Sequence, residues 1–149
     1  MLRSLLLGVV VMAIATSAAL ADDAVIDLEF SDFSVQSAVH QDADPFKGYA
    51  YVTVTNTGTE PWGDFHFEIY SSDGSDISNV HFADASMGGV DPTSTQSPLT
   101  WVIDNDVVGA TMDLYYYSDP VLPGNIATFT IYTDNTTDQV PFFGLMMHP

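Results

Sequence analysis

Apolar and polar residues alternate with a period of two along most of the chain after residue 21, and the 3.6-residue period of an amphipathic helix is absent there. This alternation is typical of β-strands that bury one face. About eight such segments follow one another, with turn-forming residues between them. They are residues 26–30, 49–55, 65–69, 76–83, 99–103, 112–116, 127–131 and 142–147. The last of these is almost entirely apolar, and we expect it to be a mostly buried strand. We therefore expect residues 22–149 to fold as a single all-β domain, an antiparallel, immunoglobulin-like β-sandwich.

The phase of the alternation changes once, near Ser31 and Asp32. Apolar residues stand at even positions up to Phe30 and at odd positions from Phe33 to Val35. A shift of one residue turns every following side chain to the opposite face of a sheet. The change therefore indicates either a β-bulge or a strand that passes from one sheet to the other.

The first 21 residues have the features of a secretory signal peptide. A short cationic start at residues 1–4 precedes an apolar run at residues 5–20. Ala19, Leu20 and Ala21 form the small-x-small pattern that signal peptidase cleaves. We expect residues 1–21 to be removed and the mature protein to be secreted or periplasmic, with no membrane span.

Residues 51–62 read YVTVTNTGTEPW, in which Val52, Val54, Asn56 and Gly58 form the pattern V-x-V-x-N-x-G. This pattern resembles a hairpin of exported immunoglobulin-like adhesion modules of the CARDB type. The resemblance covers only this hairpin. It implies an immunoglobulin-like sandwich in an extracellular setting, with a role in adhesion, spacing or assembly, and it implies no catalytic residues.

The charge balance limits the classes of partner. The chain has 20 acidic residues against two basic ones, and Lys47 is the only base that remains once the leader is removed. Such a surface repels the phosphate backbone, so we exclude nucleic acid as a partner. The chain contains no cysteine, which excludes thiol catalysis, and no G-x-S-x-G motif of serine hydrolases. We expect a protein that is not an enzyme and that requires no cofactor.

Tyrosines suggest a binding face. In immunoglobulin strand order the segments near residues 64–70, 110–117 and 125–133 are neighbours in one sheet. Their solvent side would then present a contiguous patch, of the kind that binds proteins or sugar rings, made of His66, Tyr70, Tyr115, Tyr117 and Tyr132. The alternative is that tyrosine suits strands and packs across them without any ligand.

Acidic residues suggest a calcium site. Asp104 and Asp106 resemble the start of a calcium loop, and loops at one end of a sandwich would bring Asp134 and Asp138 to them. The alternative is that these residues serve only in turns, where aspartate bonds to the local backbone. Histidines and methionines raise copper as a second metal, although their spacing matches no known ligand set.

These observations predict an exported, acidic β-sandwich module with a structural, adhesive or ligand-binding role. Its partner would be a protein or a glycan at the cell exterior, or a second copy of the chain. The alternative function is that of a small carbohydrate-binding or metal-carrying protein, with calcium or copper as the metal.

Overall fold

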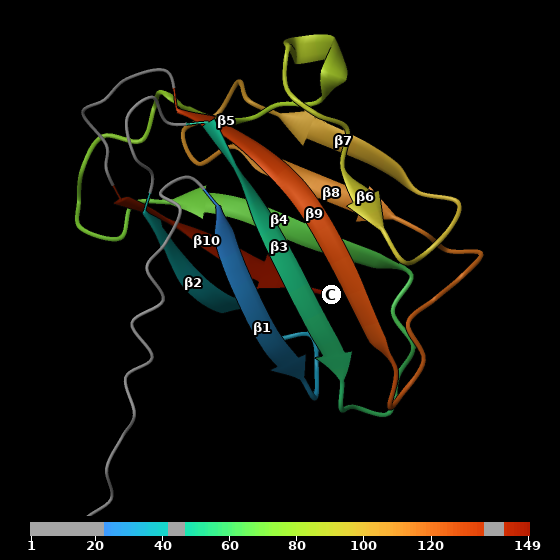
Figure 1. Cartoon of the computed structure of the whole chain (residues 1–149). Helices are drawn as coiled ribbons and strands as arrows, with labels where there is room; N and C mark the ends of the chain where they lie inside the picture. Colours follow the sequence, from blue (N-terminus) through green and yellow to red (C-terminus); the bar gives the residue numbers. More distant parts are fainter. Residues whose placement is uncertain (1–22, 42–46, 136–141) are drawn as a thin grey trace, which may run out of the picture.

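The computed structural model describes residues 23–41, 47–135 and 142–149, which form two β-sheets packed face to face (Figure 1). The strands of sheet A are, in spatial order, β1 (Ala24–Phe30), β3 (Lys47–Asn56), β9 (Ile126–Asn135) and β5 (Val80–Phe82), and β6 (Thr93–Ser94) also pairs with β9. The strands of sheet B are β2 (Gln36–Gln41), β10 (Phe142–His148), β4 (Asp64–Tyr70), β8 (Thr111–Tyr115) and β7 (Thr100–Asp104). The predicted all-β sandwich is confirmed, and the described residues form ten strands in place of about eight. The predicted leader, residues 1–21, lies outside the described residues.

The change of phase near residue 31 marks a chain that passes between the sheets. β1 pairs in parallel with β3 in sheet A, whereas β2 pairs antiparallel with β10 in sheet B. The segment between these strands leaves Phe33 and Val35 exposed, at 54% and 56%. The change of phase therefore marks a passage between the sheets and not a β-bulge. The alternation did not predict two of the strands, which are β2 and β6.

Every second residue of the long strands fills the space between the sheets. Phe65 and Phe67 of β4 and Phe129 of β9 are at most 1% exposed. The rings of Phe65 and Phe129 stack at a centroid distance of 4.9 Å, and burying a side chain of this size contributes about 1.5–3 kcal/mol. The residues between these positions point outward, so each sheet presents one outer face to solvent.

The connection from β8 to β9 crosses from sheet B to sheet A. The backbone N–H of Tyr116 donates to the carbonyl of Gly63 at 2.8 Å, and Trp62 and Val121 exchange two backbone hydrogen bonds of 3.1 and 2.8 Å. These bonds hold the crossing segment against the start of β4. As a result, β9 pairs with β3 and not with β8.

Asn56 ties this crossing to the turn that follows β3. This turn leads from sheet A to β4 in sheet B, so the hairpin predicted for residues 51–62 is wrong. The side chain of Asn56 is fully buried. The amide nitrogen donates to the carbonyls of Glu60 at 2.8 Å and Val121 at 3.0 Å, and the amide oxygen accepts from the N–H of Gly58 at 3.0 Å. A Cβ atom at Gly58 would collide with the carbonyl oxygen of Ser31. The asparagine and glycine of the V-x-V-x-N-x-G pattern thus have a structural use in this chain.

Asp84 fixes the segment between β5 and β7. It caps the short 3-10 helix η1 (Ala85–Met87), because its carboxylate accepts from the N–H groups of Ser86 at 2.9 Å and Met87 at 3.2 Å. It also accepts from the indole N–H of Trp101 at 3.1 Å. The hydrogen bond from Ser86, followed in size by the one from Trp101, holds the pKa of Asp84 below its usual value.

Within the described part of the chain, no helix has the length and apolarity needed to cross a membrane.

Candidate binding surface on the outer face of sheet B

The outer face of sheet B brings together residues from three neighbouring strands. In β4, Phe65 and Phe67 point into the core, so His66 between them points outward. The register places His66 opposite His148 of β10 on one side and opposite Asp113 of β8 on the other. This pairing sets two imidazoles and a carboxylate side by side across the sheet.

Four rings form a row across this face. The imidazoles of His148 and His66 stack at 4.7 Å with 23° between their planes. The ring of Tyr115 lies 6.5 Å from that of His66, edge to face, and Tyr117 lies 5.7 Å from Tyr115 at 31°. We refer to His148, His66, Tyr115 and Tyr117 as the ring row. Tyr117 is its most exposed member, at 67%.

Two carboxylates hold the rings in place. Oδ1 of Asp113 lies 2.7 Å from Nδ1 of His66, whose N–H donates a hydrogen bond to the carboxylate, and Oδ2 accepts a hydrogen bond from the hydroxyl of Tyr115 at 3.4 Å. Oδ2 of Asp64 accepts from the hydroxyl of Tyr117 at 3.2 Å, and Oδ1 lies 3.8 Å from Nε2 of His66. Each ring except His148 is thus oriented by an acid of the same face. Nδ1 of His148 donates instead to the carbonyl of Pro149 at 2.9 Å.

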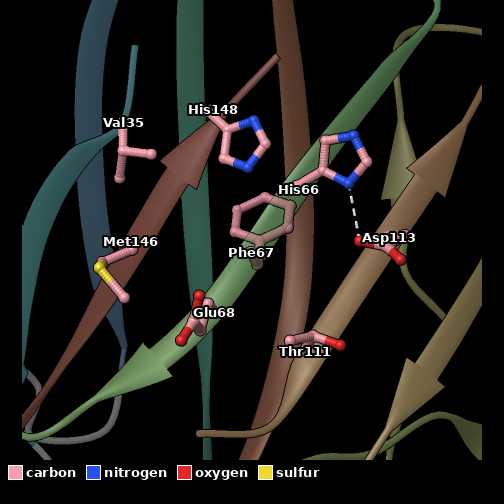
Figure 2. A pocket seen from close by; sticks show the side chains of 8 residues that line it. All are labelled: Val35, His66, Phe67, Glu68, Thr111, Asp113, Met146 and His148. Atoms are coloured by element: carbon pink, nitrogen blue, oxygen red, sulfur yellow. Dashed lines mark hydrogen bonds and ion pairs between the residues drawn. The ribbon is translucent and has the colours of Figure 1, made fainter. Parts of the chain in front are cut away.

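A hollow of about 230 Å³ opens beside the two histidines (Figure 2). Figure 2 shows Val35 and Met146 on one side of it and Thr111 and Asp113 on the other. Glu68 contributes a further carboxylate. A second, shallower hollow of about 380 Å³ adjoins the other end of the ring row, where it is lined by Pro98, Thr100, Tyr115, Tyr117 and Ser118. The ring row therefore borders two depressions on one face.

The tyrosines of the row stay protonated at neutral pH. Desolvation raises the pKa of the Tyr115 hydroxyl above its usual value, and the nearby charge of Asp113 adds to this. Desolvation is also the main cause that raises the pKa of the Tyr117 hydroxyl, and its hydrogen bond to Asp64 raises this pKa further. Both side chains therefore offer neutral rings and hydroxyl groups to a ligand.

The residues of the predicted aromatic face lie on two different sheets. His66, Tyr115 and Tyr117 share the outer face of sheet B, as predicted. Tyr132 was predicted to join them, and this is wrong, because β9 belongs to sheet A. Tyr132 packs there against Tyr49, with ring centroids 5.2 Å apart.

Tyr70 shares the face of sheet B but lies outside the row. It stands four residues along β4 from His66, about 13 Å away at the rise of a strand, with Glu68 between them. Its ring covers Gly144 of β10, where a Cβ atom would collide with it. Tyr70 therefore serves in cross-strand packing.

The described residues do not assemble the predicted calcium site. Asp104 ends β7 in sheet B, whereas Asp134 belongs to β9 in sheet A. The N–H of Asp106 donates to the carboxylate of Asp104 at 2.9 Å, which is the local turn geometry of the alternative interpretation. Asp138 lies outside the described residues. Among the residues that the structure describes, no group of three or more His, Asp or Glu side chains is arranged to hold a metal ion.

Three residues of this surface, His148, Asp113 and Asp64, were not predicted from the sequence to belong to the binding face. The alternation of residues 112–116 carried a signal for Asp113, because it places this residue between the buried Met112 and Leu114. Residues 142–147 were predicted to be a mostly buried strand, so the partner of His66 in β10 was not sought.

Comparisons of the chain with family models, with curated proteins and with solved structures found no match. The interpretation of the surface consequently depends on its own geometry.

Proposed function

We propose that this protein is an exported, non-catalytic recognition module that binds a neutral glycan on the outer face of sheet B. The observation that carries the proposal is the ring row, held by Asp64 and Asp113 beside a hollow of about 230 Å³. Aromatic faces stack on the C–H faces of sugar rings, while carboxylates and hydroxyls accept and donate hydrogen bonds at the sugar hydroxyls. Ligand sites of this kind combine apolar rings with a few fixed polar groups.

The charge of the surface favours an uncharged ligand. Asp64, Glu68 and Asp113 lie along the row and hollow, and the whole chain carries a formal net charge of −18. Anionic polysaccharides would meet repulsion at this face. Neutral sugars meet no such repulsion, and their hydroxyl groups can donate hydrogen bonds to the carboxylates.

The dyad of His66 and Asp113 supports recognition rather than hydrolysis. In a nucleophilic site the second imidazole nitrogen faces a hydroxyl or a thiol. Here Nε2 of His66 faces the carboxylate of Asp64, at 3.8 Å. The proposed setting outside the cytoplasm is supported by the signal-peptide pattern of residues 1–21.

The proposal is tested in two steps. Native electrophoresis in gels that contain neutral polysaccharides identifies a glycan that retards the purified protein, and calorimetry with a soluble oligosaccharide of that glycan then measures the affinity at a single site. Tyr117→Ala and Tyr115→Ala should each weaken binding about 5- to 30-fold, which corresponds to the 1–2 kcal/mol of an aromatic anchor. Phe33→Ala serves as the matched control, because Phe33 is an exposed aromatic residue outside the row.

Urea unfolding of each variant separates lost binding from lost folding. Tyr117 is largely exposed, so its replacement should change stability by no more than about 0.5 kcal/mol. Equal losses of affinity in Tyr117→Ala and Phe33→Ala, or the absence of binding to every neutral glycan, would contradict the proposal.

A further inference from the structure

A single strand of sheet B lines both hollows of its outer face. Thr111 and Asp113 of β8 line the first hollow, of about 230 Å³. Tyr115, which ends this strand, and Tyr117 just beyond it line the second, of about 380 Å³. Figure 2 shows Thr111 and Asp113 on the same side of the first hollow. Thr111 and Tyr115 are four residues apart, or about 13 Å at the rise of a strand. The hollows thus follow one another along β8, and a single sugar ring is too short to reach from one to the other.

Tyr117 is held in position although it is largely exposed. A Cβ atom at Gly63 would meet Cδ1 of the tyrosine ring at 2.6 Å, so the ring lies directly on the backbone of this glycine. The hydroxyl donates to Oδ2 of Asp64 at 3.2 Å, and the ring lies 5.7 Å from that of Tyr115. A side chain that is fixed before binding loses little conformational freedom when a ligand arrives. Tyr117 therefore forms a preorganised wall of the second hollow.

Two loops form another part of the second hollow and are tied to each other. One loop carries Pro98 and the other carries Ser118, and both residues line the hollow. The backbone N–H of Ser97 donates to Oδ2 of Asp119 at 3.1 Å. The side-chain amide of Gln96 donates to the backbone carbonyl of Asp119 at 2.6 Å. The second hollow is thus built from groups that hold one another in place.

The two hollows offer different groups to one ligand. The first combines imidazoles with the carboxylates of Glu68 and Asp113, which accept hydrogen bonds. The second offers the hydroxyls of Thr100 and Ser118, which donate and accept, beside two tyrosine rings. Each unit of a neutral sugar chain carries both hydroxyl groups and C–H faces. One such chain can therefore meet the requirements of both hollows at once.

We propose that the outer face of sheet B binds a linear oligosaccharide along β8, with one part of the chain in each hollow. The inference rests on the proposed binding of a neutral glycan and adds the length and the direction of the ligand. Contacts in the two hollows reinforce each other, because the second contact forms at a high effective concentration once the first is made. A chain that fills both hollows should bind at least about tenfold more tightly than a single sugar.

Calorimetry with a series of oligosaccharides of the retained glycan, from one sugar upward, tests this proposal. We expect the affinity to rise with chain length until both hollows are filled, and then to level off. Glu68→Ala removes a carboxylate from the first hollow, and Tyr117→Ala removes a ring from the second. Each variant should weaken binding of the longest chain at least about fivefold. A chain too short to reach both hollows should respond to only one of the two variants.

Glu29→Ala and Phe33→Ala are the matched controls, because both residues are exposed and neither lines these two hollows. They should leave the affinity for every chain length unchanged, and urea unfolding verifies that each variant folds. An affinity that does not change with chain length would overturn this proposal and leave glycan binding by the ring row in place. So would a long chain that Tyr117→Ala weakens and Glu68→Ala does not. The absence of binding to every neutral glycan would overturn both proposals.

Discussion

Replacing Asn56 by alanine should destabilise the protein far more than any exposed asparagine would. Asn56 is 0% exposed, and its side chain makes three hydrogen bonds that join the end of β3, the turn that follows it and the crossing from β8 to β9. Asn56→Ala removes all three. The N–H of Gly58 then loses its acceptor, whereas the carbonyl of Val121 keeps a second bond, from the N–H of Trp62.

The magnitude follows from these bonds. Each contributes about 1 kcal/mol net, and a buried polar group left without a partner costs about 1–3 kcal/mol. We therefore expect the free energy of unfolding to fall by about 3 kcal/mol, a large part of the 5–15 kcal/mol that is typical of a domain. With a urea slope of about 2 kcal/mol/M, the unfolding midpoint would move down by about 1.5 M.

Urea unfolding followed by tryptophan fluorescence measures this shift, because Trp62 is buried beside the crossing. Asn125→Ala is the matched control: Asn125 is exposed, and its replacement should change stability by about 0.5 kcal/mol at most. A loss below about 1 kcal/mol for Asn56→Ala, or one no larger than in the control, would refute the role assigned to this amide.

Three further outcomes are expected. Gly58→Ala should lower the free energy of unfolding by about 1–3 kcal/mol, because its new methyl group meets the carbonyl of Ser31; a neutral effect in urea unfolding would contradict this. Asp84→Ala should lower the melting temperature at pH 7. Since the folded-state pKa of Asp84 lies below the usual 3.8, its stabilisation is complete above that value and is lost as the pH falls through the folded pKa. The difference in melting temperature between wild type and variant should thus shrink as the pH falls below 3.8, and a constant difference would be evidence against it. The melting temperature of the wild type should also rise with NaCl, because salt screens a net charge of −18; a flat profile up to 1 M would show that the acids do not repel.

The sequence predicted which way side chains point better than which strands are neighbours. The alternation in residues 65–69 placed His66 outward correctly, because the direction of a side chain along a strand is a local property. The position of β9 was not predicted, since it depends on the ten-residue connection that crosses between the sheets. Bonds such as those between Trp62 and Val121 set that path, and no local pattern encodes them. Tyr132 was therefore assigned to the wrong sheet.

The last strand shows a second limit. Residues 142–147 read FFGLMM, a continuous apolar run that hides the period of two. In the structure Gly144 points outward beneath the ring of Tyr70, and Met146 lines the hollow beside His66. Outward positions occupied by glycine and methionine resemble buried ones, and so the place of His148 in the ring row could be found only from the strand pairing.

The proposed binding of a glycan by the ring row can be followed residue by residue. The measurement is nuclear magnetic resonance of the side chains during titration with the retained oligosaccharide. We predict that the imidazole signals of His66 and His148 and the ring signals of Tyr115 and Tyr117 shift together and saturate at the calorimetric affinity, while those of Tyr132 on the opposite sheet do not move. Shifts confined to Tyr49, Tyr51 and Tyr132 of sheet A, or a titration that leaves the ring row unmoved, would contradict glycan binding at this face.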